Sequence, residues 1–309
     1  MPDAADSTVI ATRALTKRYR DVLAVDALQL DVRRGEIYGF LGRNGAGKTT
    51  TIRMLLGLIR PTSGEVSVLG RRIGPGETGV FGRVGFLVES ASAYPNLTVR
   101  ENLEIQQRLM GAPTSAVTGA IEQLSLSEYA DRRAGRLSLG NKQRLSLARA
   151  ILHSPDVLVL DEPANALDPA GIVEIRELLR SLADEHGVTV FMSSHILGEV
   201  THLADRIGII HEGRLLEELD RDELQAKARE FVEVRVSDPT RAEALLREAG
   251  FPHIERDPDS PGVLHVQDAA DRTARIAAVL VGAGLELTAL TATREDLETY
   301  FLRLTGGAS

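Results

Sequence analysis

Residues 42–49 read GRNGAGKT, a spacing typical of a loop that wraps phosphate groups with its backbone N–H donors. The loop lies between an apolar run at 37–41 and a helix-compatible stretch at 49–59. Lys48 would neutralise the β- and γ-phosphates, and the Thr49 hydroxyl would bind Mg²⁺. The alternative is a glycine-rich turn without a ligand. The spacing favours a bound nucleoside triphosphate, held by Gly42, Arg43, Asn44, Gly45, Ala46, Gly47, Lys48, Thr49 and Thr50.

Two carboxylates follow the apolar run at 157–160, which is typical of a buried parallel strand. The carboxyl end of such a strand faces the ligand crevice, so Asp161 is placed to bind Mg²⁺ directly or through water. Glu162 is a candidate general base for the water that attacks the γ-phosphate. An ordinary acidic pair before a proline turn is the alternative. Combined with the glycine-rich loop, the pair favours hydrolysis of the nucleotide over binding alone.

A further anion site is indicated by Ser138 and Gly140, which precede a helical pattern at 145–152. A serine at the start of a helix accepts from backbone N–H groups, and the positive end of the helix attracts anions. Taken alone, this segment is simply a helix cap. Its meaning therefore depends on its place among the other motifs.

In this order, the three segments resemble those of the ATP-binding subunit of the ABC transporter family, over about residues 8–217. The resemblance implies that ATP and Mg²⁺ are bound, and that Ser138 and Gly140 of one subunit contact the γ-phosphate held by the other. Asp168 matches a loop that couples two sites across a dimer. His195 matches the switch histidine, which contacts the γ-phosphate and orients the catalytic water. Tyr19 matches the aromatic residue that stacks on adenine.

Two features differ from the commonest pattern of that family. Glu89 occupies the position of a glutamine that senses Mg²⁺ and the attacking water, so we expect Glu89 to bind the metal or to act in catalysis. The alternative is a solvated loop acid. In residues 137–144, which match the signature segment of that family, Leu139 and Asn141 replace the usual glycine and glutamine. At both places the residues resemble those found in ATPases of exporters for drugs, lantibiotics and bacitracin-like peptides.

Composition separates this chain from several other classes of protein. Its 309 residues, 43% of them hydrophobic, are enough for two domains with cores of their own. No stretch approaches the roughly 20 apolar residues that cross a bilayer, so a transported substrate would need a separate membrane protein. The formal charge of −8 offers nucleic acid no overall attraction. The absence of cysteine excludes disulfides and thiolate metal sites.

Apolar runs that alternate with amphipathic stretches predict a mainly parallel α/β sheet in residues 1–219. Strands are expected at 37–41, 157–160, 188–192 and 207–210, and the resemblance implies a P-loop ATPase core with a helical subdomain inserted at about 96–152. Residues 220–309 form a predicted linker and an accessory α+β domain. Their order of strand and helix patterns, βαββαβ, suggests a ferredoxin-like fold. We expect this domain either to support or regulate a dimer or to be a passive stabilising appendage.

The resemblance implies a cytoplasmic ATPase at the inner face of the membrane, which dimerises around two Mg·ATP. We expect it to drive a separate transmembrane permease, with export of a drug, antibiotic or peptide. Alternatives are a soluble ATPase of the same type in translation or DNA repair, and a regulatory nucleotide-binding protein. Translation factors of this type usually carry two cassettes, and DNA-repair ATPases carry a long coiled coil. The intact Glu162 and His195 argue against a regulator without turnover.

Overall fold

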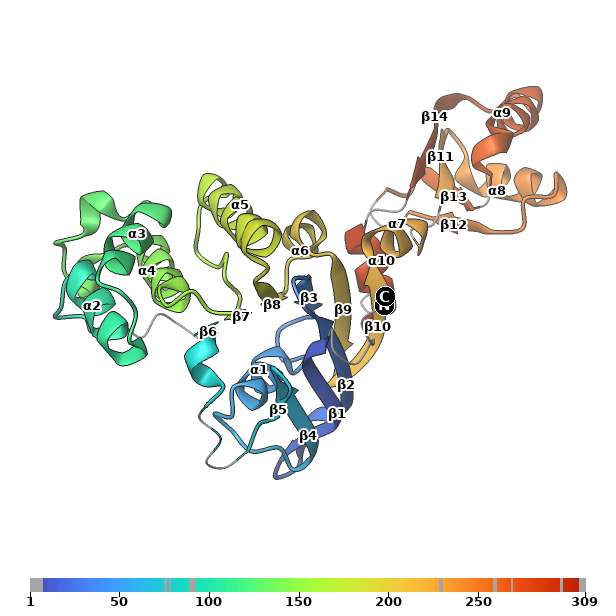
Figure 1. Cartoon of the computed structure of the whole chain (residues 1–309). Coiled ribbons are helices and arrows are strands. Elements are labelled where there is room, and N and C mark those ends of the chain that lie inside the picture. The colour runs from blue at the N-terminus through green and yellow to red at the C-terminus, as the bar shows by residue number, and fades with distance from the viewer. Residues whose placement is uncertain are drawn as a thin grey trace. The chain divides into compact units, whose positions relative to one another are not determined.

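The computed structural model describes residues 8–74, 77, 79–88, 93–227, 230–257, 260–267, 269–294 and 297–305. The chain divides into two compact units, Met1–Arg221 and Asp222–Ser309 (Figure 1). In the described parts of the chain, every helix is too short or too polar to cross a bilayer.

The centre of the first unit is a six-stranded sheet in the order β10-β9-β3-β8-β7-β6. All of its strand pairs are parallel except β10 and β9, which are antiparallel. The carboxyl ends of β3, β8 and β7 therefore meet at one edge, where ligands bind in sheets of this type. The four strands that the sequence predicts are confirmed. The strands are β3 (Ile37–Leu41), β6 (Val84–Leu87), β7 (Val157–Asp161), β8 (Thr189–Ser194), β9 (Arg206–His211) and β10 (Arg214–Asp220).

A second, antiparallel sheet packs against the central one in the order β2-β1-β4-β5. One apolar core joins residues of both sheets with those of helix α1 (Lys48–Leu55). Within it, the rings of Tyr38 and Phe191 stack with centroids 5.6 Å apart. This core packs β3, a strand of the central sheet, against the antiparallel sheet. It thereby fixes the start of the glycine-rich loop, which follows β3. The strands are β1 (Thr8–Tyr19), β2 (Val22–Arg33), β4 (Ser63–Val68) and β5 (Arg71–Arg72).

Helix α1 is shorter than the sequence predicts, because it ends at Leu55 and not near residue 59. Gly57 adopts a left-handed backbone with φ 65°, which glycine reaches without a steric cost. Its N–H donates to the Met54 carbonyl, and the Leu58 N–H donates to the Arg53 carbonyl. These two bonds satisfy carbonyl groups of the last turn in the Schellman pattern, and they end the helix.

Three helices, α2 (Val99–Met110), α3 (Ser115–Gln123) and α4 (Leu139–Ile151), group together beside the edge strand β6 (Figure 1). Thr98 and Glu101 cap α2 reciprocally in a capping box. Helix α4 lies very close to β6, since a Cβ atom at Gly85 would be 2.1 Å from the Ala150 carbonyl oxygen. The remaining helices are η2 (Phe81–Arg83), η3 (Ser127–Tyr129), η4 (Ala134–Arg136), α5 (Pro169–His186) and α6 (Leu197–Leu203).

The second unit contains an extra antiparallel sheet in the order β12-β13-β11-β14. Val232, Val234 and Val236 alternate into its core, where α8 and α9 cover one face. The last strand of this sheet, β14, extends to Arg294. The elements from the end of the first unit onward are α7 (Arg221–Lys227), β11 (Glu230–Val236), α8 (Pro239–Glu248), β12 (Ile254–Arg256), β13 (Val263–Gln267), η5 (Ala270–Arg272), α9 (Thr273–Gly282), β14 (Leu287–Arg294) and α10 (Leu297–Leu304).

Candidate nucleotide-binding site

The glycine-rich loop joins β3 to α1 and borders a cavity of about 240 Å³. Gly47 precedes the helix with φ 108°, and a Cβ atom there would lie 2.5 Å from the Ala24 carbonyl oxygen. A side chain at this position would therefore be strained and would strike backbone. Arg43 and Asn44 are exposed, whereas Ala46 is buried. The cavity is lined by Ala24, Asn44, Gly45, Gly47, Lys48, Thr49, Thr50 and Glu162.

Lys48 is the buried cation of this cavity, with 6% of its surface exposed. Its Nζ donates to the carbonyl oxygens of Gly42 at 2.7 Å and Arg43 at 3.3 Å. The same nitrogen lies 3.3 Å from Oε1 of Glu162. The loop carbonyls thus hold the ammonium group between the glycine-rich loop and the end of β7, where it can meet an anion.

Asp161 ends β7, and 6% of the residue's surface is exposed. Thr49 Oγ1 donates to its Oδ2 at 2.7 Å, although the two residues are 112 positions apart in the sequence. Ser193 Oγ donates to Oδ1 at 2.6 Å. Two oxygen groups predicted to bind the same metal ion are therefore in direct contact. An alcohol and a carboxylate are the hard oxygen ligands that Mg²⁺ prefers, so these residues fit that ion.

Glu162 and His195 come from the ends of neighbouring strands and lie side by side. His195 Nδ1 is 2.8 Å from Glu162 Oε2, so one Glu162 oxygen faces the histidine and the other faces Lys48. The backbone of Glu162 is left-handed with φ 52°, an uncommon conformation for a residue with a side chain. Its N–H donates to Ser193 Oγ at 3.1 Å. The chain bends sharply here and turns the carboxylate towards the loop.

Ser138 caps α4 and accepts from the Asn141 N–H at 3.2 Å. Ser138 is exposed, and neither Ser138 nor Gly140 lines the cavity beside the loop. Leu139, the unusual residue between them, is 63% exposed. The structure therefore leaves the signature segment outside the loop site of its own chain.

The other predicted residues are more dispersed. Asp168 caps α5 by accepting from the Gly171 N–H at 3.0 Å. Tyr19, at the end of β1, is 42% exposed, and Lys17 Nζ lies 4.9 Å from its ring centroid. Neither Asp168 nor Tyr19 lines the cavity. Glu89 lies outside the described residues.

Polar residues to which the sequence prediction assigned no role complete the site. Ser193 links the carboxylate of Asp161 to the backbone of Glu162. Ser194 Oγ donates to Glu199 at 2.9 Å, and burial, together with the nearby Glu162 charge, raises the pKa of Glu199. The serine doublet before His195 is a sequence signal for part of this arrangement. Its partners are visible only in the fold.

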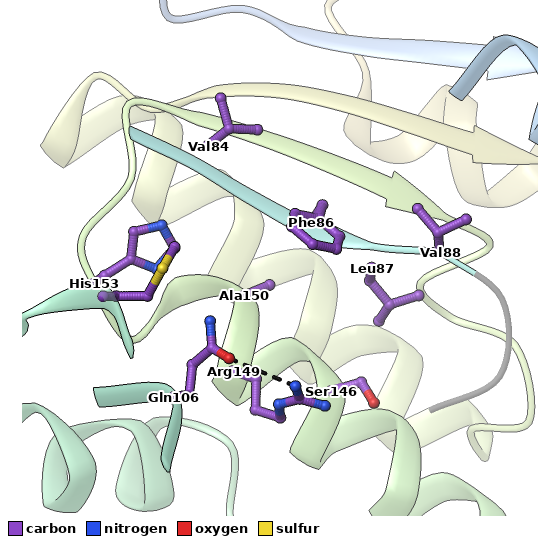
Figure 2. A pocket seen from close by; sticks show the side chains of 10 residues that line it. Val84, Phe86, Leu87, Val88, Gln106, Ser146, Arg149, Ala150 and His153 are labelled. Atoms are coloured by element: carbon purple, nitrogen blue, oxygen red, sulfur yellow. Dashed lines mark hydrogen bonds between the residues drawn. The ribbon is translucent and has the colours of Figure 1, made fainter. Parts of the chain in front are cut away.

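A separate groove lies between β6 and the helices α2 and α4, with a volume of about 80 Å³ (Figure 2). Phe86 is 45% exposed there, and Arg149 donates to Gln106 Oε1 at 3.5 Å. Burial lowers the pKa of His153 in the same groove. Its mixed lining consists of Val84, Phe86, Leu87, Val88, Gln106, Met110, Ser146, Arg149, Ala150 and His153.

Known proteins resemble this chain in both sequence and structure. The family model described as ABC transporter matches residues 25–165. The bacitracin transport ATP-binding protein BcrA of Bacillus licheniformis is 43% identical over 304 residues, which cover 98% of this chain and 99% of that protein. The protein of the same name from Enterococcus faecalis is 41% identical and covers 97% of each chain. The lantibiotic transport ATP-binding protein SrtF of Streptococcus pyogenes is 36% identical over 67% of this chain and 89% of its own length.

Solved structures agree with these relationships over about two thirds of this chain. A dimeric ATP-binding cassette bound to ADP and phosphate has a TM-score of 0.64 at 25% identity, covering 69% of this chain and 98% of that one. An ATP-binding subunit of an ABC transporter has a TM-score of 0.66 at 26% identity, covering 71% and 93%. With its loop site, its paired carboxylates and full-length relatives above 40% identity, this chain belongs to the ABC transporter family as an ATP-binding subunit that hydrolyses ATP.

Proposed function

We propose that this ATPase powers the export of a peptide antibiotic of the bacitracin or lantibiotic type through a separate membrane permease. The observation that carries the proposal is the 43% identity to a bacitracin transport ATP-binding protein over 98% of this chain. That match includes the second unit, which the family model does not reach. A shared accessory unit supports a shared transport task more strongly than a shared ATPase core does.

In the proposed reaction, Lys48 neutralises the β- and γ-phosphates, and the glycine-rich loop positions them with its N–H groups. The 2.7 Å contact between Thr49 and Asp161 supports their assignment as Mg²⁺ ligands. When bound, Mg²⁺ supplies positive charge that stabilises the phosphates during transfer. Because both groups already lie together, little rearrangement is needed before the metal is held.

Glu162 acts as the general base, and one of its carboxylate oxygens takes the proton of the attacking water. The carboxylate is held at both oxygens, since His195 Nδ1 lies 2.8 Å from Oε2 and Lys48 Nζ lies 3.3 Å from Oε1. His195 is then placed to orient the water and to contact the γ-phosphate. Tyr19 stacks on adenine, and its exposed ring at the end of β1 supports this role. Glu89 remains a proposed ligand of Mg²⁺ or of the water.

Two copies of the chain form a dimer in which Ser138 and Gly140 of one copy contact the nucleotide held by the other. The exposed cap of α4, away from the loop cavity of its own chain, supports this arrangement. Dimeric solved structures of related cassettes support it independently. Asp168, at the start of α5, would couple the two sites.

The permease contacts the groove shown in Figure 2, at the edge of the core next to β6. This groove combines an exposed aromatic ring, Phe86, with the polar pair Gln106 and Arg149, a surface suited to a short amphipathic segment. With a permease as its membrane partner, the protein would lie at the cytoplasmic face of the membrane. We propose no nucleic acid as a partner. No helix of the described residues provides an anchor of its own.

For the second unit we propose a ferredoxin-like fold and a role in supporting or regulating the dimer. Its elements follow in the order βαββαβ, and its antiparallel sheet has the order β12-β13-β11-β14, an arrangement compatible with that fold. In functional terms, residues 1–219 then form the ATPase domain, with residues 96–152 as its helical subdomain, and residues 220–309 form the linker and accessory domain.

The test is purification of the Glu162→Gln variant from detergent-solubilised host cells with Mg·ATP, followed by mass spectrometry. This variant keeps the binding groups but lacks the base, so it should retain ATP, dimerise and bring a multi-span permease with it. Lys48→Ala is the matched control, since it removes the phosphate cation and should recover much less permease under the same conditions. Ribosomal or DNA-repair proteins as the stoichiometric partners would overturn the transporter role while leaving the ATPase intact.

A further inference from the structure

The first two turns of α4 rest on the segment that follows β7. Gly140, Gln143 and Arg144 have the i, i+3, i+4 spacing that places residues on one helix face. A Cβ atom at Gly140 would lie 3.2 Å from the carbonyl oxygen of Ala166, which shows how closely the helix approaches this segment. Arg144 NH1 lies 2.5 Å from Oε2 of Glu174 on α5. Helix α4 and the turn after β7 therefore pack directly against each other, and we call this contact the α4–β7 joint.

Gln143 is the polar centre of this joint, and only 8% of its surface is exposed. Its Nε2 donates to the carbonyl oxygen of Glu162 at 3.1 Å and to that of Pro163 at 3.0 Å. A carboxamide nitrogen has two hydrogens, so one side chain holds two consecutive carbonyl groups. Both accepting carbonyls belong to the turn that carries the proposed base. None of the roles assigned above to the signature segment uses this side chain.

The turn needs such support because Glu162 has an unfavourable backbone conformation. A left-handed backbone at a residue with a side chain costs about 1–3 kcal/mol and persists only where neighbouring groups hold it. Ser193 accepts from the N–H of Glu162, while Gln143 donates to its C=O. The residue is thus fixed on both sides. Loss of either bond would let the backbone relax and carry the carboxylate away from Lys48 and His195.

We propose that Gln143 is a positioning residue for ATP hydrolysis, which acts through the backbone of Glu162. It also links the two sites of the dimer, an extension that rests on the proposed function. Ser138 caps the same helix five residues earlier, about 7.5 Å along the axis. A phosphate from the partner's site that contacts Ser138 would shift α4, and Gln143 transmits that shift to the base of its own site.

The first experiment compares Gln143→Met with wild type in the purified full-length chain. Methionine keeps the length and the apolar stem but donates no hydrogen bond. We expect kcat to fall about tenfold or more, because the two lost bonds act on the position of the base. Affinity for a fluorescent ATP analogue should stay within about twofold, since Lys48 and the loop are unchanged. Gln123→Met is the matched control, an exposed glutamine of α3, and should behave as wild type.

A second measurement separates positioning from a general structural effect. Amide hydrogen exchange should rise in the peptide that covers residues 162–166 and remain unchanged in the antiparallel sheet. If the methionine variant does not fold, Gln143→Glu provides the same readout, because it keeps the shape and turns the donor into an acceptor. A parallel loss of kcat, affinity and thermal stability would assign Gln143 a structural role and overturn the proposal.

The Glu162→Gln variant distinguishes the two levels of inference. If this variant loses turnover while Gln143→Met retains the wild-type kcat, the role of Gln143 is wrong and the proposed function stands. If Glu162→Gln retains full turnover, or the wild-type chain has none, the proposed catalytic scheme fails, and the inference that depends on it fails too.

Discussion

The Ser193→Ala substitution probes the link between the two acidic residues of the site. The Ser193 hydroxyl is fully buried, donates to Asp161 at 2.6 Å and accepts from the Glu162 N–H at 3.1 Å. Alanine removes one hydroxyl and thereby breaks both bonds. It leaves the Thr49 contact with Asp161 in place. The carboxylate then keeps one of these two hydroxyl donors, while the Glu162 N–H loses its acceptor.

The expected loss of stability follows from these two bonds. A hydrogen bond to a charged group contributes about 1.5–3 kcal/mol, and a buried N–H without a partner costs about 1–3 kcal/mol. Their sum gives a loss of roughly 2.5–6 kcal/mol, because the fully buried hydroxyl leaves little room for water to replace it. Against a total stability of about 5–15 kcal/mol, this loss removes a large part of the free energy of unfolding. We also expect a lower kcat, since both acidic residues lose an anchor.

The assay is urea unfolding followed by circular dichroism, with hydrogen exchange of β7 and β8 to locate the change in the first unit. Ser146→Ala is the control, because that buried hydroxyl donates to the carbonyl oxygen of Lys142 in its own helix, at 3.1 Å. Its effect should stay within about 0.5 kcal/mol. If Ser193→Ala and Ser146→Ala are equally stable and equally active, the Ser193 hydroxyl does not hold the site together.

Two further predictions concern the core and the pH response. Gly208→Ala places a Cβ atom 2.2 Å from the Tyr38 hydroxyl, which donates to Glu218, so we expect a loss of about 1–3 kcal/mol in urea unfolding. Addition of Tyr38→Phe should recover part of it, and a Gly208→Ala variant as stable as wild type would contradict the packing argument. For Glu199, burial raises the folded-state pKa, so the contribution of this carboxyl to stability falls as pH rises above about 4.5 and it ionises. Glu199→Gln should gain relative stability from pH 4 to pH 7, whereas a constant difference across that range would show that ionisation is not responsible.

Much of the fold is predictable because its signals are local. The buried strands β3 and β7 appear as short apolar runs, and β11 appears as alternation over Val232, Val234 and Val236. Boundaries are less predictable, since they depend on neighbours. Helix α1 ends early at the Gly57 turn, and β14 continues to Arg294 because it pairs with β11 along its length. Glu89 lies outside the described residues, so its role stays a prediction.

The sequence by itself determined the groups whose chemistry depends on adjacent atoms. The glycine-rich loop, the acidic pair at the end of β7 and the helix cap at Ser138 are of this kind, because their geometry follows from spacing and backbone conformation. Only the tertiary structure decided which distant residues meet. Ser193 reaches Asp161 because β8 lies between β3 and β7, and Gln143 reaches Glu162 because α4 packs on the turn after β7. Strand order and helix docking result from the packing of the whole core, and no short stretch of sequence encodes them.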